Sequence, residues 1–262
     1  MENDGFDLLF LGTGAADWDW SRYGRRGVRG SCATLVDGRV MIDCGATGFR
    51  SLVRFGGDPR ALRELWFTHS HGDHCHPGEV AALLAARGRR AAPLVLRGTA
   101  PLLERLAAAL GAAPGGRFEP RPFAPLAPFR TRGWRVTPLP ANHLGAIPGE
   151  TCVHYLVRGP RKSFLYALDG AWMTAAARAA VGSAPLDLVV WDATVEKPGD
   201  WRMFSHNDLA MVRMLSARLA ADGVVRPDTV LVLDHLARTL WRRPVRPPKR
   251  FVAARDGLRL RV

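Results

Sequence analysis

Short apolar runs alternate with longer amphipathic runs along most of the chain. Strands are predicted where a short apolar run stands between turn residues. The turn Asp37-Gly38 between two such runs is typical of a β-hairpin. The expected strands are Phe6–Leu11, Ala33–Val36, Val40–Ile42, Leu65–Phe67, Pro93–Leu96, Trp134–Leu139, Cys152–Val157, Phe164–Leu168, Leu186–Trp191, Thr229–Leu233 and Leu258–Val262.

Helices are predicted at three places between these strands. The run Pro77–Ala86 has proline at its start and an acid in its first turn, and Ala100–Leu110 is rich in Leu and Ala. A third helix is expected from Asn207-Asp208 to about Ala221. The stretch Gly111–Arg130, rich in Pro, Gly and Arg, is interpreted as a surface connection. The pattern therefore predicts one α/β domain, residues 1–262, with mixed sheets.

The composition is that of a globular protein with a buried core. The chain has 262 residues, of which 47% are hydrophobic and 23% charged, and this excludes collagen, coiled coil and general disorder. No apolar run reaches the roughly 18–20 residues of a membrane span, and the first residues lack the basic segment of a signal peptide. Cys32, Cys44, Cys75 and Cys152 form no CxxC pair. We therefore expect a cytoplasmic protein with no membrane partner.

The net charge raises the question of an anionic partner. Lys and Arg number 37 against 24 acids, which gives +13, and a basic tail covers about residues 238–262. Such a balance attracts phosphates and RNA. A solvated arginine-rich surface is the alternative interpretation.

A histidine cluster stands directly after the predicted strand Leu65–Phe67. The segment THSHGDH holds four candidate metal ligands, His69, His71, Asp73 and His74. Imidazole and carboxylate together suit zinc, manganese or iron. His69 and His71 can point the same way from an extended loop, while the pair after Gly72 turns toward a second point. One loop can therefore supply ligands to two metals.

Three more polar residues stand where predicted strands end. His143 follows VTPLP, Asp169 follows FLYAL, and His235 follows VLVLD. The carboxyl ends of strands are the usual place of an α/β active site. Each residue alone could cap a turn, but together with the cluster they are expected to be ligands.

These residues resemble a known family. HSHGDH is the HxHxDH motif of the metallo-β-lactamase superfamily, and the resemblance covers roughly residues 6–240, with Asp43 at the place of an early structural aspartate. The segments LLFLGTGAA, VTPLPANH and SHNDL are similar to the phosphoribosyl cyclic phosphodiesterase (PhnP) family. Asp192 in VVWDAT, His206 and the segment ending at Arg238 are also similar to ribonuclease Z.

The resemblance implies a fold and a ligand set. The fold would be a four-layer αββα sandwich around two divalent metal ions, zinc or manganese, with iron as an alternative. The first metal would be held by His69, His71 and His143, the second by Asp73, His74 and His235, with Asp169 bridging them.

The resemblance also implies a reaction. A small phosphodiester, such as a cyclic phosphate on a sugar or nucleotide, would be hydrolysed with Asp73 orienting the attacking water. His206 would contact the phosphate and protonate the leaving oxygen, oriented by Asp192. Alternatives are RNA cleavage of the ribonuclease Z type, hydrolysis of a non-phosphate ester, lactone or thioester, and a non-enzymatic metal-bearing binding protein. A homodimer is an open alternative for the assembly.

The sequence departs from both relatives in places. After GTG the phosphodiesterase has a cysteine-rich zinc loop, whereas this chain has DWDWSRYGRRGVRG, so no structural zinc is expected. The tRNA-gripping arm of bacterial ribonuclease Z is not seen between His143 and Asp169. Arg238 stands where the phosphodiesterase has a histidine.

A few further residues have two interpretations each. Trp18 and Trp20, among arginines in the loop after GTG, would stack a base or hold a substrate phosphate, or else pack within a surface loop. His76 is expected to cap a helix or support a ligand, and His154, inside a strand, is expected to be structural.

Overall fold

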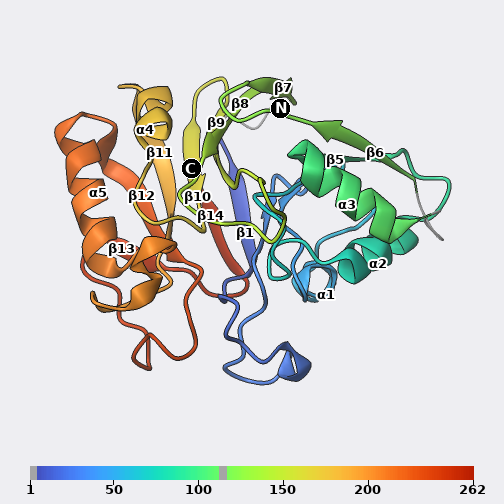
Figure 1. Cartoon of the computed structure of the whole chain (residues 1–262), viewed down its shortest axis with the longest axis horizontal. Coiled ribbons are helices and arrows are strands. Elements are labelled where there is room, and N and C mark those ends of the chain that lie inside the picture. The colour runs from blue at the N-terminus through green and yellow to red at the C-terminus, as the bar shows by residue number, and fades with distance from the viewer. Residues whose placement is uncertain (1–4, 112–116) are drawn as a thin grey trace.

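Two seven-stranded sheets form the middle of the molecule, and helices cover the outer side of each sheet (Figure 1). The structure is a computed structural model that describes residues 5–111 and 117–262. The four layers run helix, sheet, sheet, helix, which confirms the αββα architecture expected from the sequence. Among the described residues, no helix is both long enough and apolar enough to cross a membrane.

The first sheet carries the histidine loop. Its strand order is β14-β1-β2-β3-β4-β5-β6, antiparallel from β14 to β3 and parallel from β3 to β6. Three helices pack on its outer side, α1 (Gly48–Arg54), α2 (Pro77–Arg87) and α3 (Ala100–Leu110). The strands are β1 (Asp7–Gly12), β2 (Ala33–Val36), β3 (Val40–Ile42), β4 (Glu64–Trp66), β5 (Leu94–Gly98), β6 (Phe118–Pro122) and β14 (Leu258–Arg261).

The second sheet has the order β13-β12-β11-β10-β9-β8-β7 and is covered by α4 (Ala175–Val181) and α5 (Leu209–Ala221). It is antiparallel from β7 to β10 and parallel from β10 to β13, so both sheets are mixed, as predicted. Its strands are β7 (Phe129–Thr131), β8 (Trp134–Pro140), β9 (Val153–Arg158), β10 (Ser163–Ala167), β11 (Leu186–Asp192), β12 (Val225–Asp234) and β13 (Phe251–Ala253).

An aromatic core joins the two sheets. Phe6 packs edge-on against Trp134 and Phe164, with ring centroids 5.2 Å and 4.8 Å apart. Trp66 and Tyr155 meet in the same layer, and all of these side chains are buried. Burial of large aromatic side chains from both sheets fixes one sheet against the other. The ends of strands from different sheets are thereby held at one edge of the sandwich.

The structure corrects one prediction and adds elements that the sequence pattern did not reveal. The stretch Gly111–Arg130 is not only a surface connection, because it contains β6 and the start of β7, each an edge strand. An edge tolerates proline, since one side of the strand needs no hydrogen-bond donors. Residues 112–116 of this stretch lie outside the described residues. The helices α1 and α4 and the strand β13 were not predicted, and the basic tail forms β13 and β14.

Strand ends at one edge of the sandwich supply the functional residues. His69 comes shortly after β4, and His143 after β8. Asp43, Asp169 and His235 follow β3, β10 and β12 and have positive φ angles of 61°, 50° and 58°. Backbone strain of this kind at non-glycine residues is concentrated at functional sites, where the surrounding structure maintains it.

Candidate metal centre

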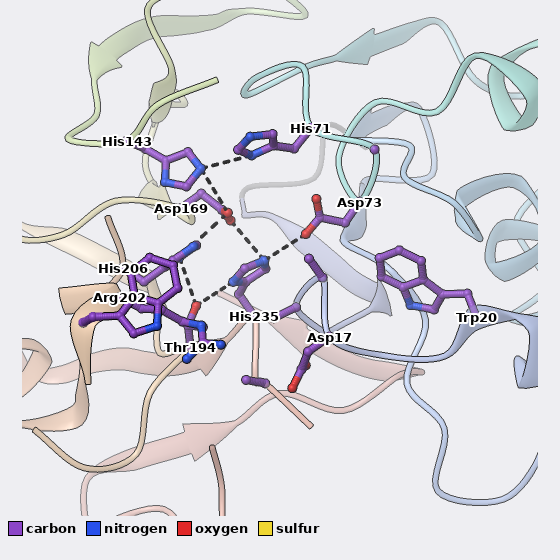
Figure 2. A pocket seen from close by; sticks show the side chains of 15 residues that line it. Asp17, Trp20, His71, Asp73, His143, Asp169, Thr194, Arg202, His206 and His235 are labelled. Carbon is purple, nitrogen blue, oxygen red and sulfur yellow. Dashed lines mark hydrogen bonds and ion pairs between the residues drawn. The ribbon is translucent and has the colours of Figure 1, made fainter. Parts of the chain in front are cut away.

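The first group of ligand atoms comes from three histidines. His71 Nδ1 lies 3.0 Å from His69 Nε2 and 3.2 Å from His143 Nε2. His69 and His71 belong to the loop after β4 and His143 to the loop after β8, so both sheets contribute. The three nitrogens converge on one point, as Figure 2 shows for His71 and His143.

The second group lies beside the first. Asp73 Oδ2 is 3.6 Å from His74 Nε2 and 3.3 Å from His235 Nε2. All three side chains are buried. His235 reaches this group from the end of β12, more than 160 positions along the chain from Asp73. The two groups together contain the ligands that the resemblance implied.

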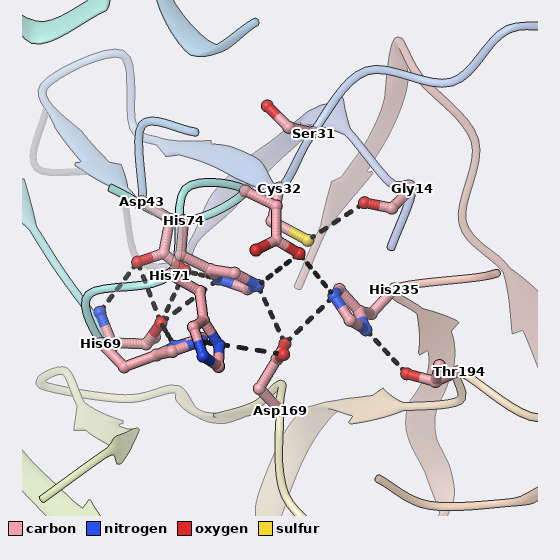
Figure 3. A network of polar contacts seen from close by, with 12 residues as sticks. Gly14, Ser31, Cys32, Asp43, His69, His71, His74, Asp169, Thr194 and His235 are labelled. Atoms are coloured by element: carbon pink, nitrogen blue, oxygen red, sulfur yellow. Dashed lines mark hydrogen bonds and ion pairs between the residues drawn. The ribbon is translucent and has the colours of Figure 1, made fainter. Parts of the chain in front are cut away.

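Asp169 lies between the two groups and faces each with a different oxygen. Its Oδ2 is 3.8 Å from His69 Nε2 and 3.7 Å from His143 Nε2. Its Oδ1 is 3.0 Å from His74 Nε2 and 3.3 Å from His235 Nε2 (Figure 3). This is the arrangement required of a carboxylate that bridges two cations.

Hydrogen bonds on the far side of the imidazoles fix which nitrogen faces the centre. His74 Nδ1 lies 2.8 Å from Asp43 Oδ2, and His143 Nδ1 donates to the carbonyl of Ser205 at 2.9 Å. His235 Nδ1 lies 2.7 Å from the hydroxyl of Thr194. Each contact places the proton of the neutral imidazole on Nδ1 and turns Nε2 inward, as a metal ligand requires.

The residues present fit a pair of divalent cations. His74 Nε2 and Asp169 Oδ1 are buried and lie 3.0 Å apart, yet neither has a hydrogen-bond partner. Donor atoms around a tetrahedral zinc ion stand about 3.3 Å apart, close to the separations seen within both groups. Buried carboxylates also need compensating positive charge, and Asp43, Asp73 and Asp169 are all buried here.

The pKa values of the ligand histidines fall into two classes. Burial holds the pKa of His69 well below its usual value and also lowers that of His143, which keeps both imidazoles neutral. Burial acts in the same direction on His74 and His235, but the nearby carboxylates, with Asp169 first, raise their pKa values well above the usual one. The second group therefore has a strongly negative field that favours a bound cation.

A third histidine arrangement stands next to the two ligand groups. His206 Nδ1 lies 2.9 Å from Asp192 Oδ2 and 3.1 Å from Thr194 Oγ1. Burial opposes the charged form, but the Asp192 carboxylate raises the pKa of His206. Its Nδ1 is 3.9 Å from Asp169 Oδ2, so the imidazole is held at the edge of the centre.

The centre opens into a hollow of about 620 Å³. Trp20, on the one-turn helix Trp20–Arg22, borders it on the side opposite His206 and Arg202 (Figure 2). The indole Nε1 of Trp20 is buried and has no hydrogen-bond partner. The residues that line the hollow are Ala15, Ala16, Asp17, Trp20, His71, Gly72, Asp73, His143, Asp169, Thr194, Trp201, Arg202, His206, His235 and Ala237.

A small rigid unit stands at the mouth of this hollow. The guanidinium of Arg202 donates to both oxygens of Asp200 at 3.0 Å and lies 5.0 Å from the centre of the Trp201 ring. The Trp201 side chain is nevertheless 70% exposed. An aromatic face held by a cation and open to solvent is suited to stacking on a planar ligand.

The remaining sequence candidates fall outside this hollow. Trp18 is buried and donates through Nε1 to the carbonyl of Leu236, so of the two loop tryptophans only Trp20 lines the hollow. His76 caps α2 by accepting from the backbone of Glu79. His154 is buried on β9.

Several residues of the site had no signal in the sequence. The sequence analysis missed Thr194, Trp201 and Arg202. Their position at the site depends on tertiary structure, and none of them belongs to a ligand motif. Arg238, which was noted at the place of a histidine, donates through its backbone and Nε to Asp17 and fastens the rim of the hollow.

The comparisons with known proteins identify the family. The family model described as "Beta-lactamase superfamily domain" matches residues 38–231. No curated protein matches the chain. The resemblance to metallo-β-lactamase-fold hydrolases inferred from the histidine loop is thereby confirmed.

Solved structures show the same fold over nearly the whole chain. The metallo-β-lactamase fold protein YhfI from Bacillus subtilis is 14% identical, with a TM-score of 0.75, and 98% of this chain and 100% of that one are covered. A diphosphatase from the PhnP family is 20% identical, with a TM-score of 0.70 and 97% of both chains covered. The short form of human tRNase Z is 18% identical, with a TM-score of 0.69 and coverage of 97% and 98%. At these identities the likeness establishes the fold alone.

Proposed function

Since the chain belongs to the beta-lactamase superfamily, we propose that it is a metal-dependent hydrolase of a small phosphodiester, such as a cyclic phosphate on a sugar or nucleotide. One observation carries the proposal. His206, paired with Asp192, faces the same hollow as the two ligand groups, so a proton donor stands beside the place where a phosphate would be bound.

The ligand groups define where the cations belong. His69, His71 and His143 would hold one divalent cation, and the group of Asp73, His74 and His235 the other, with Asp169 between them. Zinc or manganese is expected, with iron as an alternative. When bound, such a pair supplies an activated water at neutral pH and polarises the phosphoryl oxygens.

The chain itself supplies the proton for the leaving group. Asp192 accepts from His206 Nδ1, so the imidazole is held in one orientation with Nε2 free to donate. The raised pKa favours the protonated form of this imidazole. Transfer of its proton to the departing oxygen avoids release of an unstable alkoxide, and general acid catalysis of this kind contributes about 10²- to 10⁴-fold.

The hollow selects for a compact substrate. Trp20 and Trp201 supply aromatic surface, and Arg202, which is paired with Asp200, lines the same hollow. A planar base or a sugar ring would lie against the aromatic side chains while the phosphate faces the ligand groups. A hydrogen bond from the backbone of Arg238 to Asp17 connects the C-terminal and N-terminal loops at the rim of the hollow.

One group of arginines lies away from the metal centre. A separate hollow is lined by Arg60, Arg63, Arg87, Arg89 and Arg90. Arg60 and Arg63 precede β4, whereas His69 follows it, so the arginines lie at the opposite end of that strand. This group therefore does not by itself support RNA binding at the metal centre.

The first experiment measures cleavage of bis(p-nitrophenyl) phosphate by protein shown to carry two zinc or manganese ions per chain. We expect turnover that disappears in His69→Asn together with bound metal. His76→Asn, which changes an exposed histidine and retains a helix-capping side chain, is the matched control and should keep full activity. Absence of phosphodiester cleavage at full metal loading, with cleavage of p-nitrophenyl acetate instead, would overturn the proposal in favour of ester, lactone or thioester chemistry.

A further inference from the structure

A cysteine lies under the second ligand group. Cys32 directly precedes β2 and is 0% exposed. Its Sγ and one ring nitrogen each of His74 and His235 all lie within 4.8 Å of one another. Figure 3 shows the sulfur over the gap between the two imidazoles. A third kind of donor atom thus faces the position assigned to the second cation.

The contacts of this thiol do not explain its position. The hydrogen bond from Cys32 Sγ to the carbonyl of Gly14 is long, at 3.7 Å. Cys32 forms no disulfide, and the other three cysteines of the described chain are free as well. The neighbouring His74 Nε2 is fully buried and has no hydrogen-bond partner. The sulfur and this nitrogen are therefore both available as ligand atoms for one metal ion.

We propose that Cys32 is a ligand of the second metal position, where its thiolate joins the donors of Asp73, His74 and His235. The inference rests on the metal centre of the proposed function and extends its ligand set. No redox step is involved: the thiol proton passes to the solvent buffer as the metal binds, and a sulfur–metal bond forms.

A sulfur donor changes which metal the second position accepts. Thiolates favour zinc and other soft or borderline cations, while manganese prefers oxygen donors. The first position, with His69, His71 and His143, has no sulfur among its donors. The second position therefore selects zinc over manganese, whereas the first discriminates less between them.

Cobalt substitution tests the ligand directly, because cobalt occupies zinc sites and reports sulfur ligation by a charge-transfer band in the near ultraviolet. We expect the intact protein, produced in cobalt-supplemented medium, to show this band. Cys32→Ser should lose the band but keep the visible d–d bands, and Cys152→Ser, which removes another buried thiol, should keep both. Visible bands with no charge-transfer band in the unsubstituted protein would overturn the role of Cys32 and leave the metal centre intact. Failure to bind cobalt at all would overturn the metal centre and this inference together.

A second measurement needs no variant and decides the matter if Cys32→Ser does not fold. X-ray absorption at the zinc edge of the zinc-loaded protein should show a sulfur neighbour at about 2.3 Å. A shell of nitrogen and oxygen only would contradict the proposal. Where the variant folds, its second zinc should be bound roughly 10- to 100-fold more weakly, with a shift of metal preference toward manganese.

Discussion

The hydroxyl of Thr194 lies 2.7 Å from Nδ1 of His235 and connects the metal centre to the proton donor. The same oxygen donates to Asp192 Oδ1 at 2.6 Å and lies 3.1 Å from His206 Nδ1. One buried side chain therefore orients a metal-binding imidazole, the acid that supports His206, and His206 itself. Its replacement should affect metal binding and catalysis together.

Thr194→Val keeps the shape of the side chain and removes the hydroxyl. We expect binding of the second metal to weaken by about 10- to 100-fold, because His235 loses the partner that fixes its orientation. The measurement is zinc retained against a competing chelator, followed by turnover at saturating zinc. Thr229→Val removes a buried hydroxyl that bonds to the Leu186 carbonyl, and it should destabilise the fold without changing zinc retention. Equal retention in both variants would refute the orienting role.

The proton-donating role of His206 predicts a dependence on the leaving group. His206→Asn should lower kcat by about 10²- to 10⁴-fold for a phosphodiester that expels a sugar hydroxyl. The kcat for bis(p-nitrophenyl) phosphate should fall far less, because p-nitrophenolate is a stable leaving group without a proton. Two bound metals per chain must be verified in the variant. An equal loss for both substrates would indicate that His206 positions the phosphate and does not protonate the leaving oxygen.

The effect of a Trp201 substitution on KM tests whether the substrate carries a base. Stacking on an exposed aromatic side chain contributes about 1–3 kcal/mol per base. Trp201→Ala should therefore raise KM roughly 5- to 160-fold for a cyclic nucleotide and leave kcat nearly unchanged, since the indole is not placed to contact the reacting atoms. Phe204→Ala is the matched control, because Phe204 is 79% exposed on the same turn but does not line the hollow. A KM that is unaffected for nucleotides would point to a sugar phosphate without a base.

The ligand set could be anticipated because it depends on local order along the chain. The spacing of His69, His71, Asp73 and His74 places four donors on one loop, and each later candidate follows an apolar strand. Most strands were predicted for the same reason, since alternation of apolar runs and turn residues is a local pattern.

The remaining parts of the site depend on register and on packing between distant segments. Thr194 reaches His235 because β11 and β12 pair in parallel with Asp192 opposite Asp234. No local sequence pattern predicts that β11 and β12 pair in this register. Cys32 precedes β2, and His74 lies in the loop after β4. The two residues come close only because of the order of these strands in the folded sheet. Strand β6 escaped prediction because its two prolines are compatible with a strand only at an edge, and edge position is set by tertiary structure.

His154 predicts an acid sensitivity of the fold that is separate from the loss of metal. Burial lowers the pKa of His154 from 6.5 to about 4, and neither ring nitrogen has a hydrogen-bond partner. The folded state therefore keeps this imidazole neutral, while the unfolded chain takes up a proton below pH 6.5. The contribution of the neutral His154 side chain to the free energy of unfolding is fully present above that pH and declines as the pH falls toward 4. The loss amounts to about 3 kcal/mol in total, of which roughly 2 kcal/mol is reached by pH 5.

The test compares urea unfolding of the unsubstituted protein and His154→Gln at pH 8 and pH 5 with the same metal supply. Both proteins lose the metal-dependent part of their stability in acid, so the difference between them isolates His154. We expect the advantage of the unsubstituted protein to shrink by roughly 2 kcal/mol between these two pH values. His154→Leu serves as a second variant, because it removes the titrating group without placing an amide in the apolar layer. A difference that is independent of pH in both variants would mean that His154 finds a proton-accepting partner in solution.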